Sequence, residues 1–163
     1  MDSFRTRITD LLDARGVSYR LLPHTEAVFT VEAAARQRGV LLEEMVKSIL
    51  LREAGQSGRY VMACVPGAER VAPKAVQAVL GEEWRRLHFA SAEEIRAVTG
   101  CVQGAVAPVG LPDDVPVIFD EVIGKLARCN ISSGDPLCGL ELIAADLIRV
   151  ARGRLAAITG GSE

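Results

Sequence analysis

Residues 99–121 constrain the fold more than any other part of this chain. A turn with glycine at both ends, residues 104–110, precedes a short polar loop and the apolar run 115–119, which stops at Asp120. Residues with small or no side chains allow a ligand to lie directly against the peptide groups of such a loop. We therefore expect a loop beside a buried strand, in which peptide N–H and C=O groups carry most of the chemistry.

Length and composition predict one domain with a sizeable core. The chain has 163 residues, 49% of them hydrophobic, which excludes a disordered chain. The domain should span residues 1–158, followed by a flexible tail at 159–163. A net charge of −2 provides no broad basic surface for DNA. An aromatic content of 4% argues against a stacking platform for single-stranded nucleic acid.

We expect a cytoplasmic protein without a metal ion or cofactor. The four cysteines form no C-x-x-C pair, and the two histidines, His24 and His88, do not cluster with them as a zinc site requires. Such cysteines are typical of reduced, mostly buried thiols. No apolar run reaches the length of a membrane span, and the charged N-terminal residues lack the apolar core of a signal peptide. No membrane partner is therefore expected.

Apolar periodicity and capping residues predict a mixture of helices and strands. Helices are expected over residues 3–15, 31–38, 73–80 and 92–99, with a last helix from Ala144. Strands are expected over residues 17–22, 45–51, 60–66, 87–90, 115–119, the end of 124–131, and 140–143. This order lacks the regular alternation of a doubly wound sheet. We therefore expect an α+β domain, a mixed α/β fold with a partly closed, barrel-like central sheet flanked by helices.

Three side chains in the first third of the chain are candidates for a binding site, each with a plainer alternative. Lys47 lies inside the apolar run 45–51. Its ammonium either extends along the strand to water or meets a phosphate or carboxylate in a cleft. His24, in a turn, is interpreted as a surface residue rather than a catalytic base. Phe29 either packs as a hydrophobic staple before the N-cap Thr30 or forms the wall of a pocket.

Three later segments leave similar alternatives open. Residues 104–110 match neither a dinucleotide-binding loop nor a P-loop. They form either a tight hairpin with a bulge, or a backbone wall that binds a small substrate and places an N–H near a developing oxyanion. Residues 132–134 form either an ordinary turn or a second polar wall. Glu141 alternates with apolar neighbours and faces either the pocket or solvent. No nucleophilic triad is evident.

Five motifs follow one another in the order found in a known family. They are His24 with Phe29 before an alanine-rich helix, the lysine strand 45–50, the glycine loop 99–112, the strand 117–120, and the closing segment 132–147. With these motifs the chain resembles the YbaK-like aminoacyl-tRNA deacylases, which share a domain with the editing insertion of bacterial prolyl-tRNA synthetase. The resemblance covers about residues 3–158.

The resemblance implies a function and a set of site residues. The activity would be hydrolysis of the ester between a wrong amino acid and the 3′ end of tRNA, without a metal or cofactor and helped largely by the substrate's own ribose hydroxyl or side chain. Its partners would be the aminoacyl-tRNA acceptor end and a prolyl-tRNA synthetase. Lys47 would hold the terminal nucleotide or its phosphate, Gly104 would contact the aminoacyl group and orient water, and Asp120 would polarise the pocket. The remaining binding residues would be His24, Phe29, Thr30, Ala105, Val106, Pro108, Ser132, Ser133, Gly134 and Glu141.

The expected substrate is Cys-tRNA(Pro), then Ala-tRNA(Pro), because a pocket lined by glycine, alanine and serine admits small acyl groups. Residues 132–139 are longer than the corresponding segment of the cysteine-specific branch, which would reshape the acyl pocket. This leaves an alternative open, a non-catalytic module that binds an aminoacyl group or adenylate and partners a tRNA synthetase. A local phosphate patch, or simply solvated surface, is formed by Arg52, Arg59, Arg70, Lys74, Arg85 and Arg86.

Overall fold

The computed structural model describes residues 4–160, which contain helices and strands in irregular order. The helices are α1 (Arg7–Ala14), α2 (Val31–Arg38), α3 (Pro73–Leu80), α4 (Ala92–Thr99) and α5 (Ala144–Val150), with the short 3-10 helices η1 (Leu42–Glu44) and η2 (Ile123–Lys125). The strands are β1 (Tyr19–Pro23), β2 (Val46–Glu53), β3 (Tyr60–Pro66), β4 (Leu87–Phe89), β5 (Val117–Asp120), β6 (Arg128–Asp135), β7 (Cys138–Ile143) and β8 (Arg154–Ala156). None of the helices in the described range is long and apolar enough to cross a membrane.

The strands form two sheets. One is antiparallel, in the order β1-β7-β6, and the other has the order β4-β2-β3-β5-β8. In the second sheet β2 is antiparallel to β3 and β4, whereas β5 is parallel to β3 and β8. The expected mixed α/β class is confirmed. The strands form two sheets in place of one partly closed, barrel-like sheet, and within residues 4–160 an isolated bridge between Met45 and Asn130 joins the two.

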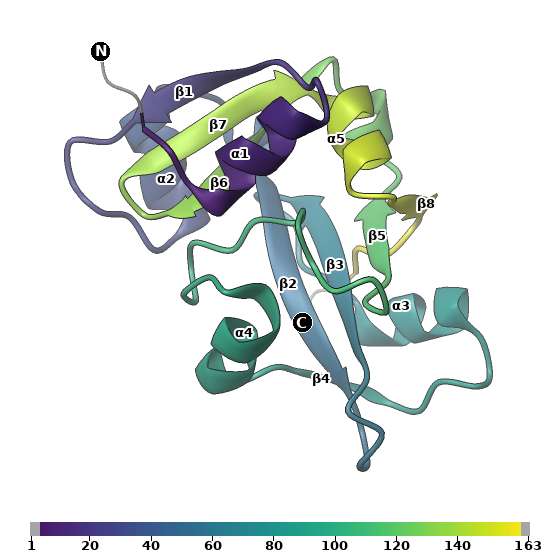
Figure 1. Ribbon diagram of the computed structural model, residues 1–163. Coiled ribbons are helices and arrows are strands. Elements are labelled where there is room, and N and C mark those ends of the chain that lie inside the picture. Colours follow the sequence, from purple (N-terminus) through teal and green to yellow (C-terminus); the bar gives the residue numbers. More distant parts are fainter. Residues whose placement is uncertain (1–3, 161–163) are drawn as a thin grey trace.

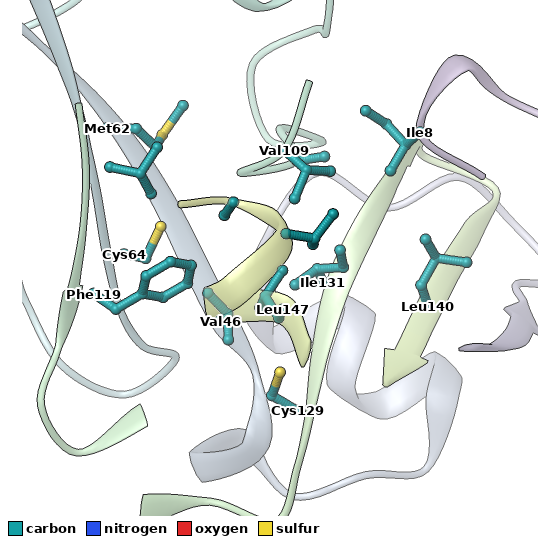
Figure 2. Packing of buried hydrophobic residues seen from close by; sticks show 14 of the residues in the cluster. Ile8, Val46, Met62, Cys64, Val109, Phe119, Cys129, Ile131, Leu140 and Leu147 are labelled. Atoms are coloured by element: carbon teal, nitrogen blue, oxygen red, sulfur yellow. The ribbon is translucent and has the colours of Figure 1, made fainter. Parts of the chain in front are cut away.

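The main hydrophobic core lies between the two sheets. Figure 2 shows Phe119 and Cys64 of the five-stranded sheet facing Ile131 of the three-stranded sheet, with Leu147 of α5 packed among them. A second cluster covers the other face of the five-stranded sheet and includes Val76 of α3. The strands β3 and β5 are therefore buried on both faces, which explains their nearly continuous apolar sequences.

Capping residues fix the ends of helices α2 and α4. Thr30 accepts a hydrogen bond from the Ala33 N–H at the start of α2, and Gly39 ends that helix in a left-handed conformation. Ser91 and Glu94 form a capping box at the start of α4. The predicted ranges 31–38, 73–80 and 92–99 are confirmed. In Figure 1, α1 and α2 lie on opposite sides of the three-stranded sheet.

The segment 132–139 differs most from expectation. Instead of a loop it is the end of a hairpin, because β6 continues to Asp135 and β7 begins at Cys138. A register shift between Ser132 and Asp135 marks a bulge in this hairpin. The predicted turn at 104–110 is likewise not a hairpin, since it lies in the connection from α4 to β5.

The C-terminal segment is more ordered than expected. The strand β8, which the sequence pattern does not reveal, pairs with β5. Thr159 bridges Val71, and the Gly160 N–H donates to the Arg70 carbonyl at 3.0 Å. These two residues are therefore part of the domain rather than of a flexible tail, and residues 161–163 lie outside the described range.

Candidate functional site

A cavity of about 480 Å³ lies where α2, β2, the loop after α4 and the β6–β7 hairpin meet. Its volume is typical of small-molecule sites. Residues from all these segments line it, although they are far apart in the chain. The predicted site residues that line it are His24, Phe29, Thr30, Lys47, Gly104, Ala105, Val106 and Ser132.

Lys47 supplies a cation to the cavity from the start of β2. Its side chain is half-buried, and loss of water contact lowers the pKa of its ammonium. Glu32 across the cavity raises that pKa and Arg70 lowers it further. Within residues 4–160 no carboxylate forms an ion pair with Lys47. The ammonium is therefore available to an anionic ligand.

Gly104 joins two walls of the cavity. Its backbone is left-handed, with φ +91°, and a Cβ at this position would overlap the carbonyl oxygen of Phe29. The Ala105 N–H donates to Val102 at 3.0 Å, whereas the Gly104 and Val106 N–H groups have no protein acceptor in the described part of the chain. Both residues line the cavity, so their N–H groups are candidates for binding a carbonyl or an oxyanion there.

His24 is held by a network that the sequence analysis did not foresee. Its Nδ1 lies 2.8 Å from the Pro136 carbonyl, and Arg38 Nε donates to its Nε2 at 3.1 Å. These partners require a neutral ring with the proton on Nδ1. Burial lowers the pKa of His24, the Pro136 carbonyl raises it, and the Arg38 charge lowers it. With both nitrogens engaged, His24 holds the hairpin in place and is not a free general base.

Arg38 itself lines the cavity from the end of α2. Burial lowers the pKa of its guanidinium to about 10, so it stays charged at neutral pH. Gly139 makes room for it, since a Cβ there would collide with the guanidinium. In the sequence, Arg38 has the pattern of a surface residue in the last turn of a helix. Its burial becomes evident only in the fold, where Gly139 faces the guanidinium.

The β6–β7 hairpin contributes a different set of residues than expected. Ser132 lines the cavity and accepts the Gly134 N–H at 3.0 Å. Ser133 is fully buried and donates to the Cys138 carbonyl at 2.7 Å, so it stabilises the hairpin instead of facing the cavity. Gly134 lies against α1, beside Ile8. Asp135 and Pro136, not foreseen in the sequence analysis, line the cavity in their place.

Three further predicted residues lie outside the cavity. Asp120 is buried and accepts the N–H groups of Val122, Ile158 and Thr159, so its carboxylate fastens the C-terminal segment. Pro108 lines a separate depression beside α1. Glu141 pairs with Arg20 across β7 and β1, at 2.7 Å.

The cavity offers a cation, backbone N–H groups and hydroxyls, but no paired nucleophile and base. Within residues 4–160, no group of three His, Cys, Asp or Glu side chains could hold a metal ion. The Asp135 carboxylate already accepts the Leu137 N–H at 2.8 Å. Such a site is suited to polarising a carbonyl and binding a phosphate while the substrate supplies the remaining groups.

Comparison with known proteins identifies the family. The model of the family described as "Aminoacyl-tRNA editing domain" matches residues 25–150, which include most of the chain and every residue that lines the cavity except His24. The chain belongs to the aminoacyl-tRNA editing family. The resemblance inferred from the ordered motifs is thereby confirmed, and the editing domain is an aminoacyl-tRNA hydrolase by class.

Two kinds of curated relatives resemble this editing domain. Over 105 residues it is 33% identical to the proline–tRNA ligase of Bacillus licheniformis. The aligned region is 64% of this chain but only 18% of the ligase. It is 25% identical over 151 residues to the multifunctional Ser/Thr-tRNA deacylase ProXp-y of Escherichia coli K12, covering 91% of the chain and 89% of that protein. The chain thus spans about a fifth of the ligase and most of the deacylase.

Solved structures share the fold of the editing domain. A protein described only as hypothetical matches with a TM-score of 0.85 at 24% identity, over 95% of this chain and all of that one. A proposed trans-editing enzyme for prolyl-tRNA synthetase matches with a TM-score of 0.79 at 24% identity, over 95% of this chain and 96% of that one. At this level of identity, the likeness establishes the fold alone.

Proposed function

We propose that this editing domain hydrolyses mischarged tRNA(Pro) in trans, with Cys-tRNA(Pro) ahead of Ala-tRNA(Pro). The observation that carries the proposal is the cavity itself, in which the Lys47 ammonium, the backbone of Gly104 and small side chains face one another. Small walls admit cysteine and alanine and exclude larger acyl groups. Because tRNA is charged in the cytoplasm, the domain would act there beside a prolyl-tRNA synthetase.

The proposed mechanism assigns each cavity wall a task. Lys47 binds a phosphate of the terminal nucleotide, and the Gly104 and Val106 N–H groups stabilise the oxyanion that forms when water attacks the ester carbonyl. The bond from the carbonyl carbon to the ribose oxygen then breaks. That oxygen receives the proton of the attacking water through the neighbouring ribose hydroxyl, leaving free amino acid and tRNA. No metal ion is required, because the substrate supplies the proton relay.

The similarity to ProXp-y favours a second substrate class. That match spans nearly the whole of both chains, and the name of the E. coli protein gives Ser/Thr-tRNA as its substrates. Serine is close to cysteine in size, and its hydroxyl can accept hydrogen bonds from cavity donors such as Arg38. Seryl and threonyl esters therefore belong in the same assay.

The test measures release of labelled amino acid from Cys-, Ala-, Ser-, Thr- and Pro-tRNA(Pro). We expect rapid cleavage of the cysteinyl ester, slower cleavage of the alanyl ester and an intact prolyl ester. Lys47→Gln should lower kcat/KM roughly 10- to 150-fold, because a hydrogen bond to a charged group contributes about 1.5–3 kcal/mol. Lys125→Gln, a matched change of an exposed lysine on η2, should have no effect.

Other outcomes have definite meanings. Faster cleavage of seryl or threonyl esters would replace the cysteine assignment with the second substrate class. If no ester is cleaved but a non-hydrolysable aminoacyl-adenosine analogue binds tightly, the domain is the non-catalytic module. If no ester is cleaved and no analogue binds, the proposal fails altogether.

A further inference from the structure

A second, wider hollow adjoins the cavity. Its volume is about 900 Å³, and it lies between β2, β4 and the start of α3. The two hollows share Lys47, Ile49 and Phe89 as lining residues, so they lie side by side. Apart from Lys47, the proposed hydrolytic mechanism uses no residue of this second hollow, which is called the β2–α3 groove below. Its lining residues are Lys47, Ile49, Arg70, Val71, Ala72, Pro73, Lys74, Arg86, Leu87, Phe89 and Gly160.

The β2–α3 groove is strongly cationic in a chain that carries a net charge of −2. Four of its lining residues are basic, Lys47, Arg70, Lys74 and Arg86, and none is acidic. Within residues 4–160, none of these four forms an ion pair with a carboxylate. Unpaired cations along one groove create a local positive potential that attracts a polyanion.

The fold divides the basic residues considered in the sequence analysis into two groups. Arg52 is paired with Glu94 at 3.3 Å, and Arg59 with the buried Glu53 at 2.8 Å. Arg85 lies near the same buried carboxylate, outside the β2–α3 groove. Only Arg70, Lys74 and Arg86 line the groove, so the fold itself distinguishes structural arginines from those free to bind phosphate.

Two exposed aromatic rings stand at the boundary of the cavity. Phe29 is 54% and Phe89 62% exposed, and both line the cavity, while Phe89 also lines the β2–α3 groove. A large apolar ring left in water beside a cationic groove indicates a contact surface. Unpaired bases stack on such rings, whereas bases inside a duplex are already stacked on their neighbours. Two rings suffice for a few nucleotides, although not for a long stacking platform.

We propose that the β2–α3 groove binds the single-stranded 3′ end of the tRNA acceptor strand. Arg70, Lys74 and Arg86 contact its phosphates and Phe89 stacks on one of its bases. The strand then passes Lys47, and its terminal aminoacylated nucleotide enters the cavity. This inference rests on the proposed function and adds to it the surface that recognises the nucleic acid.

The test compares a full substrate with a minimal one. The triple variant Arg70→Gln/Lys74→Gln/Arg86→Gln is assayed on aminoacyl-tRNA and on 3′-O-aminoacyl-adenosine, which lacks the upstream phosphates. We expect kcat/KM on aminoacyl-tRNA to fall at least tenfold, with kcat/KM on aminoacyl-adenosine unchanged. The control variant Arg15→Gln/Lys125→Gln/Arg128→Gln removes the same charge at exposed positions outside the β2–α3 groove and should behave like wild type.

A binding measurement keeps the test independent of catalysis. Fluorescence anisotropy with a labelled single-stranded RNA ending in CCA should give a log–log salt slope of about −3, as expected for four phosphate contacts on a single strand, those of Lys47, Arg70, Lys74 and Arg86. The slope should fall to about −0.7 in the triple groove variant, which keeps only the Lys47 contact. Phe89→Ala should weaken binding about 5- to 150-fold, since base stacking contributes about 1–3 kcal/mol.

The outcomes separate this inference from the proposed function. If wild type cleaves aminoacyl-tRNA and the groove variant matches it, the groove assignment is overturned while the function stands. Equal losses of kcat/KM in the groove and control variants would show that the effect depends only on net charge, and would also overturn the groove assignment. If wild type cleaves neither substrate yet binds the RNA through these residues, the proposed function fails and the groove stands. Tighter binding to a blunt duplex than to the single strand would contradict the inference.

Discussion

At the scale of single residues, the site depends on backbone shape as much as on side chains. Gly104 is left-handed and packs its α-carbon on the backbone of Phe29, so the loop after α4 and the segment before α2 touch directly. Lys47 is useful because it is partly removed from water without being neutralised by an ion pair. Arg38 and His24 hold the hairpin that closes the cavity on the other side.

Gly104→Ala should damage the site more than the fold. The left-handed backbone costs a residue with a Cβ about 1–3 kcal/mol, and the new methyl group must also push the Phe29 segment away. We expect kcat/KM for deacylation to fall more than tenfold. The matched control is Gly110→Ala, also left-handed at φ +73°, where the Cβ would meet the side chains of Arg7 and Ile8 outside the cavity and no backbone atom. Urea unfolding should show that both variants are less stable than wild type. Equal kcat/KM values for the two variants would contradict this account.

At the scale of elements, the β2–β3 hairpin is locked by a buried carboxylate. Glu53, at the end of β2, is 2% exposed and accepts two hydrogen bonds from Arg59, at 2.8 and 2.9 Å. The Arg85 N–H donates to the same carboxylate at 2.7 Å, and the Arg59 guanidinium lies 4.1 Å from the Trp84 ring centre. These contacts fasten the far end of the hairpin to the segment before β4, which also borders the β2–α3 groove.

Stability should therefore fall in acid through Glu53. The Arg59 and Ser57 side chains and the Arg85 N–H lower its pKa from 4.5 to about 2. Because the folded pKa lies below the unfolded one, the stabilisation is complete above about pH 4.5 and is lost as the pH falls toward 2. Urea midpoints of Glu53→Gln and wild type should differ at pH 7 and converge toward pH 2. Glu43→Gln, an exposed control, should follow wild type throughout, and a constant difference for Glu53→Gln would refute the linkage.

At the scale of the whole molecule, two sheets share one core, and the cavity lies where they meet. The four cysteines are all buried, at most 4% exposed. Burial raises the pKa of Cys64 and Cys129 to about 12, so their thiolates are scarce at neutral pH. A thiol in this core can react only after the packing between the sheets has opened.

Thiol labelling should therefore report opening of the whole domain. With an aromatic disulfide reagent at pH 7.5, native protein should react slowly, and four thiols should react at once in concentrated urea. Ser18→Cys, at an exposed position, provides the positive control and should add one rapidly reacting thiol. Rapid reaction of a native thiol without denaturant would show that part of the core opens separately.

The sequence by itself determined the features that depend on near neighbours. Helices α2 and α4 begin and end where their caps predict, and α3 begins at Pro73 and ends before Gly81, because such signals act within one turn of the chain. The ordered motifs identified the family, since they combine many positions. The exposed peptide backbone at Gly104 also followed from sequence, because a residue without a side chain leaves its peptide groups open to close approach.

Only the tertiary structure decided which residues share a surface. Alternation along β6 and β7 cannot show that a bulge turns Ser133 inward, that Asp120 binds the C-terminal segment, or that Arg38 reaches His24. Nor can composition show that Arg70, Lys74 and Arg86 line one groove while Arg52 and Arg59 are paired. These facts depend on packing between segments that are distant in sequence. The hydrogen-bond or ion-pair partner of each polar group is determined only when the two sheets pack together.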